Sequence, residues 1–168
     1  MKENNVKISV IGLGYVGLPL AVEFSKYFPV IGYDLSSDRI EQLKKGFDKT
    51  KELSKDEITS CGNLHFVHDP EEIQDSNVYI ITVPTPVNIN NIPDLSPLKD
   101  ASLMVASKLS NNDLVIYEST VFPGATQNIC VPILEELSGL KYNKEFFCGY
   151  SPERINPGDK NHSLSNTV

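Results

Sequence analysis

The sequence predicts an α/β fold in which a parallel, doubly wound sheet carries helices on both faces. Short apolar runs alternate along the chain with segments whose apolar residues recur at helical spacing. Strands that alternate with helices form parallel sheets, because each helix returns the chain to the edge where the next strand begins. With 168 residues, 40% of them hydrophobic and 22% charged, the chain (1–168) suffices for a single domain with a substantial core.

Six runs are expected to form the sheet. The fourth and fifth are the clearest, because they are rich in β-branched residues and bounded by polar turns, whereas the third is weaker. In chain order the strands are expected at 6–11, 30–33, 64–67, 78–83, 114–117 and 146–150.

Helices are expected between the strands, the first of them over 18–26. A later helix is expected to have Ser96 as its N-cap and Pro97 at its first helical position. Pro132 lies in another apolar run, where a helix must kink or start, since proline lacks the N–H that a helix interior needs. Apolar residues share one face of two helices: Ile40, Leu43 and Phe47 in one, and Leu98, Ala101, Val105 and Leu109 in the other.

The segment 12–17, Gly-Leu-Gly-Tyr-Val-Gly, joins the first strand to the first helix. The second strand ends at Asp34, twenty positions after Gly14. This is the dinucleotide-binding fingerprint of Rossmann-like folds in its expected context. Gly12 allows the tight turn, Gly14 lets a pyrophosphate approach the backbone, and Gly17 lets helix and strand pack closely. The helix N-terminus then offers free N–H groups to the phosphates. A tight turn without a ligand is the alternative interpretation.

Asp34 favours NAD over NADP as the cofactor. Its carboxylate can accept hydrogen bonds from the adenosine ribose hydroxyls and would repel a 2′-phosphate. Arg39 follows on the next helix, where it is a candidate partner for such a phosphate, but we interpret it as a solvent-exposed charge. The candidate cofactor-binding residues of this half are Gly12, Gly14, Tyr15, Val16, Gly17, Asp34 and Arg39.

Three more polar clusters follow strands that end at the same edge as the glycine loop. Thr85 lies between two prolines after the fourth strand, with its hydroxyl available to a ligand. Ser119 and Thr120 follow the fifth strand, and Glu153 stands beside Arg154 after the sixth. Taken singly, these are helix caps and loop charges. Together, at the edge where open α/β sheets bind ligands, they predict a functional site.

In these motifs the chain resembles the N-terminal, NAD-binding domain of the UDP-glucose/GDP-mannose dehydrogenase family, from about Lys7 to its end. The string Ser-Pro-Glu-Arg-Ile-Asn-Pro-Gly-Asp-Lys at 151–160 is similar to the branch that acts on UDP-N-acetylhexosamines (GlcNAc or GalNAc) for surface polysaccharides. UDP-glucose enzymes typically carry Phe-Leu where this chain has Arg154 and Ile155. The more specific family motifs are Val83-Pro84-Thr85-Pro86, Glu118-Ser119-Thr120-Val121 with Pro123-Gly124, and Ser151-Pro152-Glu153.

The resemblance implies oxidation of the C6 alcohol of a nucleotide sugar to a carboxylate with two molecules of NAD. It implies that the Thr120 hydroxyl positions the catalytic water and that Glu153 works with this water as an acid/base. It also implies that Thr85, Ser119 and Thr120 line the cofactor path, and that Glu153 and Arg154 lie near the substrate.

In that family a cysteine thiolate captures the intermediate aldehyde. This cysteine, the UDP-binding domain and the central helix of the homodimer correspond to sequence beyond Val168. We therefore expect the N-terminal part of a longer enzyme, inactive alone, whose partners are the UDP-N-acetylhexosamine substrate and the rest of the enzyme. No nucleophile is assigned, because Cys61, Cys130 and Cys148 lie outside such a motif. The alternatives are a free-standing NAD-binding or regulatory module, another nucleotide-sugar dehydrogenase, and a β-hydroxyacid dehydrogenase.

Composition limits the other function classes. The net charge of −7 argues against nucleic-acid binding, which needs a basic face. No membrane span or signal peptide is evident, so a cytoplasmic location away from membranes is expected. The three cysteines follow no metal-ligand or disulfide spacing, so no metal is expected.

Overall fold

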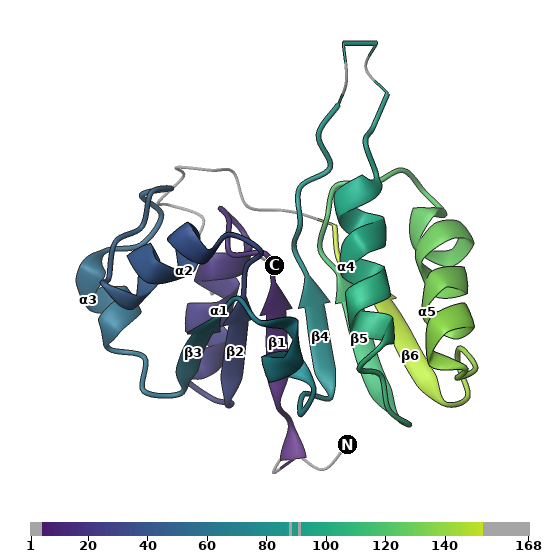
Figure 1. Ribbon diagram of the computed structural model, residues 1–168, viewed down its shortest axis with the longest axis horizontal. Helices are drawn as coiled ribbons and strands as arrows, with labels where there is room; N and C mark the ends of the chain where they lie inside the picture. The colour runs from purple at the N-terminus through teal and green to yellow at the C-terminus, as the bar shows by residue number, and fades with distance from the viewer. Residues whose placement is uncertain (1–4, 88, 91, 153–168) are drawn as a thin grey trace.

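A computed structural model describes residues 5–87, 89–90 and 92–152. Six parallel strands form one sheet in the order β3-β2-β1-β4-β5-β6 (Figure 1). The chain starts in the middle, builds outward to one edge, then crosses over and builds to the other, which confirms the doubly wound fold. The strands are β1 (Ile8–Ile11), β2 (Val30–Tyr33), β3 (Leu64–Val67), β4 (Val78–Ile81), β5 (Asp113–Tyr117) and β6 (Phe146–Tyr150).

Helices cover both faces of the sheet, as predicted. On one face, the apolar sides of α1, α2 and α3 pack on strand residues such as Val10 and Ile80. On the other, α4 and α5 pack on the alternate residues, among them Tyr79 and Val115. The helices are α1 (Gly17–Ser25), α2 (Ser37–Lys44), α3 (Lys55–Thr59), α4 (Ser96–Ala106) and α5 (Val131–Ser138), with a 3₁₀ turn η2 (Pro70–Ile73) and a π turn η3 (Thr126–Cys130).

Three helix predictions were wrong in detail. Leu109 does not continue the apolar face of α4, because that helix ends at Ala106, although Leu109 still packs against the core as a partly buried residue. Ser96 is not the N-cap of α4 but its first residue, and its N–H donates to the Asp94 carboxylate at 2.9 Å. Phe47 does not continue the apolar face of α2, because the helix ends at Lys44 and Gly46 takes a φ of +73° that turns the chain away. Phe47 is consequently 58% exposed.

The prediction at Pro132 is confirmed, because α5 starts at Val131 and the proline lies in its first turn.

The loop from β4 to α4 projects from the carboxyl edge of the sheet as a narrow arm (Figure 1). Val87 pairs with Pro93 across this arm, and the Asp94 N–H donates to the Pro86 carbonyl at 2.7 Å. Among the described residues, no helix is long and apolar enough to cross a bilayer.

Candidate functional site at the carboxyl edge

Three central strands end at the same level. Ile11 of β1 pairs in register with Ile81 of β4, which pairs with Tyr117 of β5. The loops that begin at the next residues therefore leave the sheet side by side. The glycine loop and the loops after β4 and β5 consequently share one edge, at the point where the direction of strand order reverses.

The glycine turn is packed too closely for any side chain at two of its positions. Gly12 has a φ of +96°, and a Cβ there would lie 3.3 Å from the Thr82 carbonyl group. A Cβ on Gly17 would lie 1.8 Å from the Gly12 oxygen. Thr82, which we did not single out from the sequence, donates its hydroxyl to that same oxygen at 2.6 Å. The roles predicted for these two glycines in turning and packing are thus consistent with the geometry.

The space in front of Gly14 suits a pyrophosphate. A Cβ built on Gly14 would meet no atom within 4 Å, so a ligand can approach the backbone closely. Helix α1 follows at Gly17, and its N-cap residue Val16 supplies no side-chain hydrogen bond to the first turn. Tyr15 is 49% exposed beside this opening. An open approach in front of a helix N-terminus without a side-chain cap fits a phosphate ligand.

Asp34 follows β2, and backbone N–H groups hold its carboxylate beside the glycine turn. Its Oδ2 accepts the Leu13 N–H at 2.9 Å, and its Oδ1 accepts the Ser36 N–H at 2.9 Å. An ionised carboxylate has further acceptor positions on both oxygens. The carboxylate is therefore oriented by the backbone and still able to receive ribose hydroxyl groups.

Arg39 is buried, so our interpretation of it as a solvent-exposed charge was wrong. Only 2% of the residue is exposed. Its Nε donates to the Leu13 carbonyl at 2.9 Å, and its Nη2 donates to Asp48 Oδ1 at 2.8 Å. The helix begins at the Ser36 cap, which places Arg39 on the inner side beneath the glycine turn. No sequence motif indicates that the partner is Asp48, nine residues later.

Two hydroxyl groups join the loops after β4 and β5. Ser119 is buried and donates to the Val83 carbonyl at 2.7 Å, while Thr85 donates to the Thr120 carbonyl at 2.6 Å. Neither Ser119 nor Thr120 caps a helix, because the next helical turn starts only at Thr126. Thr85 keeps only its acceptor capacity for a ligand, since its proton is already used.

The third polar cluster, which follows β6, begins at the same edge of the sheet. The Ser151 N–H donates to the Tyr117 carbonyl at 3.0 Å, which holds the chain after β6 against the end of β5. Glu153 and Arg154 lie outside the described residues. The structure therefore brings together the loops after β1, β2, β4, β5 and β6 without placing these two side chains.

Burial makes two of the three cysteines poor nucleophiles. It raises the pKa of the fully buried Cys130 thiol, and it raises that of Cys148 to about 12. Both remain protonated at neutral pH, whereas the thiolate is the reactive form. Across the described ranges, no three His, Cys, Asp or Glu side chains come together in a way that could hold a metal ion.

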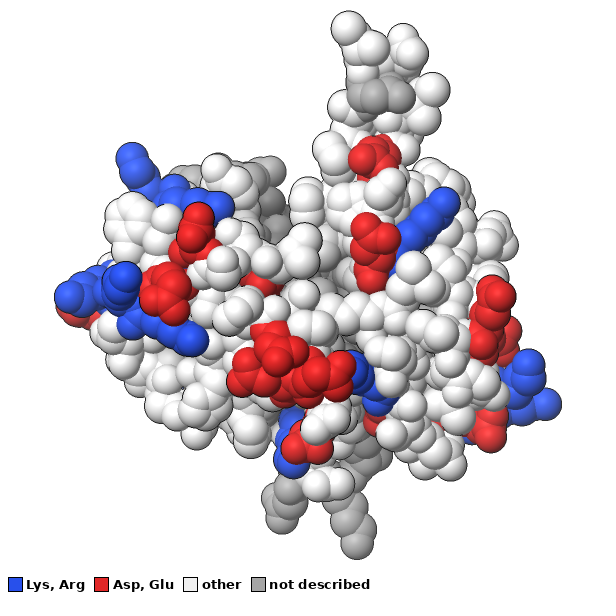
Figure 2. Space-filling view, viewed as in Figure 1, with Lys and Arg blue, Asp and Glu red and all other residues white. Residues whose placement is uncertain are grey.

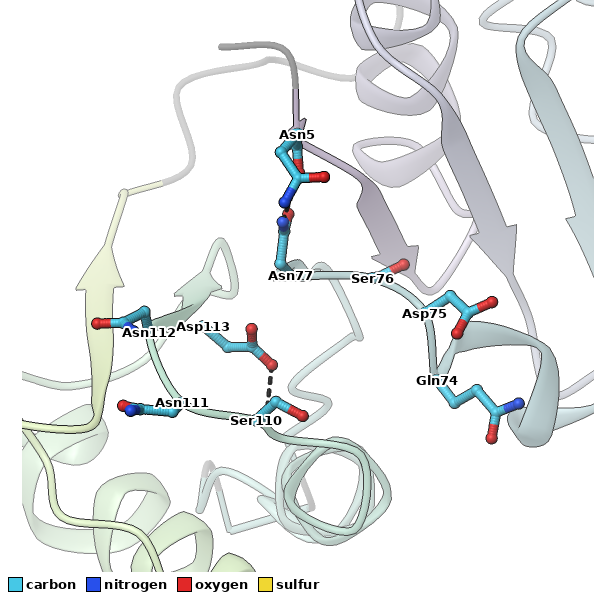
Figure 3. Close-up of a pocket in the computed structure, with 9 residues that line it drawn as sticks. All are labelled: Asn5, Gln74, Asp75, Ser76, Asn77, Ser110, Asn111, Asn112 and Asp113. Carbon is cyan, nitrogen blue, oxygen red and sulfur yellow. Dashed lines mark hydrogen bonds between the residues drawn. The ribbon is translucent and has the colours of Figure 1, made fainter. Parts of the chain in front are cut away.

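A polar hollow of about 430 Å³ lies at the opposite edge of the sheet (Figure 3). It is formed by Asn5 and by the turns 74–77 and 110–113, which lead into β4 and β5. Asp113 accepts the Ser110 N–H at 2.8 Å there. The hollow therefore lies at the amino ends of the strands, away from the glycine turn.

In Figure 2 acidic and basic side chains are interspersed, with no continuous basic surface on the face shown.

Comparison with known proteins relates the chain to nucleotide-sugar dehydrogenases, both by family match and by individual relatives. Residues 6–167 match the family described as "UDP-glucose/GDP-mannose dehydrogenase family, NAD binding domain". The UDP-N-acetyl-D-glucosamine 6-dehydrogenase of Pseudomonas aeruginosa is 52% identical over 96% of this chain, and that of Salmonella typhi 53% identical over 97%. The chain spans 38% of the length of each.

A solved structure shares the architecture. The UDP-D-ManNAc dehydrogenase from Pyrococcus horikoshii aligns with a TM-score of 0.82 and 37% identity, over 91% of this chain and 37% of its own length. The overall fold thus recurs in a protein that is 37% identical over the aligned residues.

Proposed function

The chain belongs to the UDP-glucose/GDP-mannose dehydrogenase family as its NAD-binding domain, and on that premise we propose that it serves a nucleotide-sugar 6-dehydrogenase. The proposed reaction oxidises the C6 alcohol of a UDP-N-acetylhexosamine to the uronic acid with two NAD. The observation that carries the proposal is the convergence at one edge of an open glycine turn, a fixed carboxylate and two hydroxyl-rich loops. The two UDP-N-acetyl-D-glucosamine 6-dehydrogenases that share over half of its aligned residues support the substrate class.

We assign the adenosine half of NAD to the glycine turn and Asp34. The backbone at Gly14 and the start of α1 would hold the pyrophosphate, and the Asp34 carboxylate would receive the ribose hydroxyls. The loops after β4 and β5, with Thr85 and Ser119, would line the nicotinamide half. When bound, NAD supplies the hydride acceptor for both oxidation steps.

We assign the reacting end to the loops after β5 and β6. The Thr120 residue is exposed and its carbonyl is held by Thr85, so its hydroxyl can position a water molecule. By the family motif, Glu153 would act as the acid/base with this water, and Arg154 would lie near the substrate. Water that is oriented by a hydroxyl and deprotonated by a carboxylate suits the hydrolysis of an acyl intermediate.

The nucleophile is proposed to come from elsewhere in a longer polypeptide. Cys130 and Cys148 keep their protons at neutral pH, so neither suits the capture of an aldehyde. We further propose that this domain works beside a UDP-binding domain, in a homodimeric cytoplasmic enzyme. The relatives' greater length supports the additional domain.

The test compares this chain with the protein from the complete reading frame that encodes it. Calorimetric titration of the 168-residue chain should show binding of NAD and weaker binding of NADP. The complete protein should form two NADH per uronic acid from UDP-GlcNAc or UDP-GalNAc, and the chain alone should form none. Turnover by the chain alone would contradict the assignment of the nucleophile. Turnover of UDP-glucose or GDP-mannose only would contradict the substrate class.

A further inference from the structure

A buried ion pair lies directly beneath the glycine turn. Arg39 Nη2 and Asp48 Oδ1 are 2.8 Å apart, and their side chains are 1% and 0% exposed. Arg39 Nε also donates to the carbonyl of Leu13, whose N–H donates to Asp34. The guanidinium and the Asp34 carboxylate thus hold opposite ends of one residue. The cation therefore lies next to the place where the adenosine ribose would bind.

A guanidinium in this position is normally a feature that favours NADP. Arginine near the ribose accommodates the 2′-phosphate in NADP-binding folds, because its planar fork matches phosphate oxygens. Here one of its nitrogens, Nη1, is buried and makes no hydrogen bond to any described residue. The side chain thus retains a donor, and what distinguishes it from an NADP-selecting arginine is its partner.

Asp48, the partner of Arg39, accepts several hydrogen bonds in addition to the one from the guanidinium. Besides Arg39, Asp48 accepts the N–H and the hydroxyl of Thr50 and the N–H groups of Glu52 and Leu53, at 2.7 to 3.1 Å. Burial alone would raise the pKa of Asp48, but the hydrogen bonds from Thr50, Arg39 and Leu53 leave it below its ordinary value. Asp48 therefore carries a fixed negative charge at neutral pH.

We propose that Asp48 is a positioning residue that determines cofactor specificity. It neutralises Arg39 and keeps the guanidinium on the Leu13 carbonyl, so that the cation does not attract a 2′-phosphate. Asp34 contacts the ribose directly, whereas Asp48 acts through Arg39. This inference rests on the proposed binding of NAD at the glycine turn.

The first test is Asp48→Asn in the 168-residue chain, with Thr50→Val as the matched control. Valine is close in shape to threonine and removes one donor to the same Asp48 oxygen without changing charge. NAD and NADP are titrated separately by calorimetry, and the ratio of their dissociation constants is compared. In Asp48→Asn this ratio should move toward NADP on the order of tenfold, the effect of one unit charge a few ångströms away. Thr50→Val should leave the ratio unchanged. A purely structural role would weaken both cofactors equally and would overturn the proposal.

The second test remains valid if Asp48→Asn does not fold. Asp34→Asn alters a partly exposed side chain and leaves the buried pair intact. We expect it to weaken NAD binding and to strengthen NADP binding through the loss of its own repulsion, but to leave NAD the tighter ligand, because Asp48 still neutralises Arg39. If Asp34→Asn binds NADP more tightly than NAD, Asp34 alone sets the specificity and the inference is wrong. An unmodified chain that binds neither cofactor would instead refute the NAD site itself.

Discussion

Replacing Gly17 with alanine tests how the glycine turn is packed against α1. The new Cβ would stand 1.8 Å from the Gly12 carbonyl oxygen and 2.4 Å from Thr82 Oγ1. The nearer atom belongs to the backbone and cannot rotate away, so the helix must move off the strand. Overpacking costs about 1–3 kcal/mol where side chains can adjust, so we expect a loss of at least about 3 kcal/mol here.

Circular dichroism during urea and thermal unfolding measures this loss. For a chain of this size, about 2–4 °C of Tm is lost per kcal/mol, so the variant should melt at least roughly 6–12 °C lower. Titration with NAD should show that binding is lost as well, since the start of α1 no longer faces the turn.

Gly14→Ala is the control, because it adds the same methyl group where no atom lies within 4 Å. We expect unfolding within about 0.5 kcal/mol of the unmodified chain. Its NAD affinity should fall roughly tenfold or more, because the methyl group occupies the approach to the pyrophosphate. The reasoning fails if Gly17→Ala keeps full stability, or if Gly14→Ala binds NAD as tightly as the unmodified chain.

Three further predictions follow from single contacts. Thr82→Val removes the hydroxyl that binds the Gly12 carbonyl and should cost about 1–2 kcal/mol in urea unfolding; an unchanged midpoint would contradict this role. Asp48 has a folded-state pKa below its ordinary 3.8, so its stabilisation is complete above that pH and is lost as the pH falls through the depressed value. When Asp48→Asn is titrated with acid, its free energy of unfolding should not show this loss. An acid profile identical to that of the unmodified chain would refute the prediction. In native protein at pH ~8, Cys148 should react slowly with Ellman's reagent because its pKa is about 12, and rapid labelling in a mass spectrum would contradict this raised pKa.

The sheet could be predicted closely from the sequence because its signals are local. The expected strands 30–33, 64–67 and 146–150 have the same bounds in the structure. Their runs of apolar residues end at polar or turn-forming residues, so both the burial and the boundary are encoded within a few positions. The glycine turn was equally clear, since backbone geometry there needs residues without side chains.

The wrong predictions concern positions whose state depends on distant partners. Arg39 looked exposed because an isolated charge on a helix is best solvated, yet Asp48 and the Leu13 carbonyl satisfy it in the interior. Thr82 and Asp48 escaped notice because neither belongs to a sequence motif. The role of each becomes visible only when strand order brings separate loops together.

Leu13 is held at both ends, by Asp34 at its N–H and by Arg39 at its carbonyl. The peptide groups that flank the glycine turn are therefore ordered when the chain folds and not when a ligand arrives. Ordering a loop on association ordinarily subtracts conformational entropy from the binding free energy. In this domain that loss is already part of the free energy of folding, so the turn is preorganised for its cofactor.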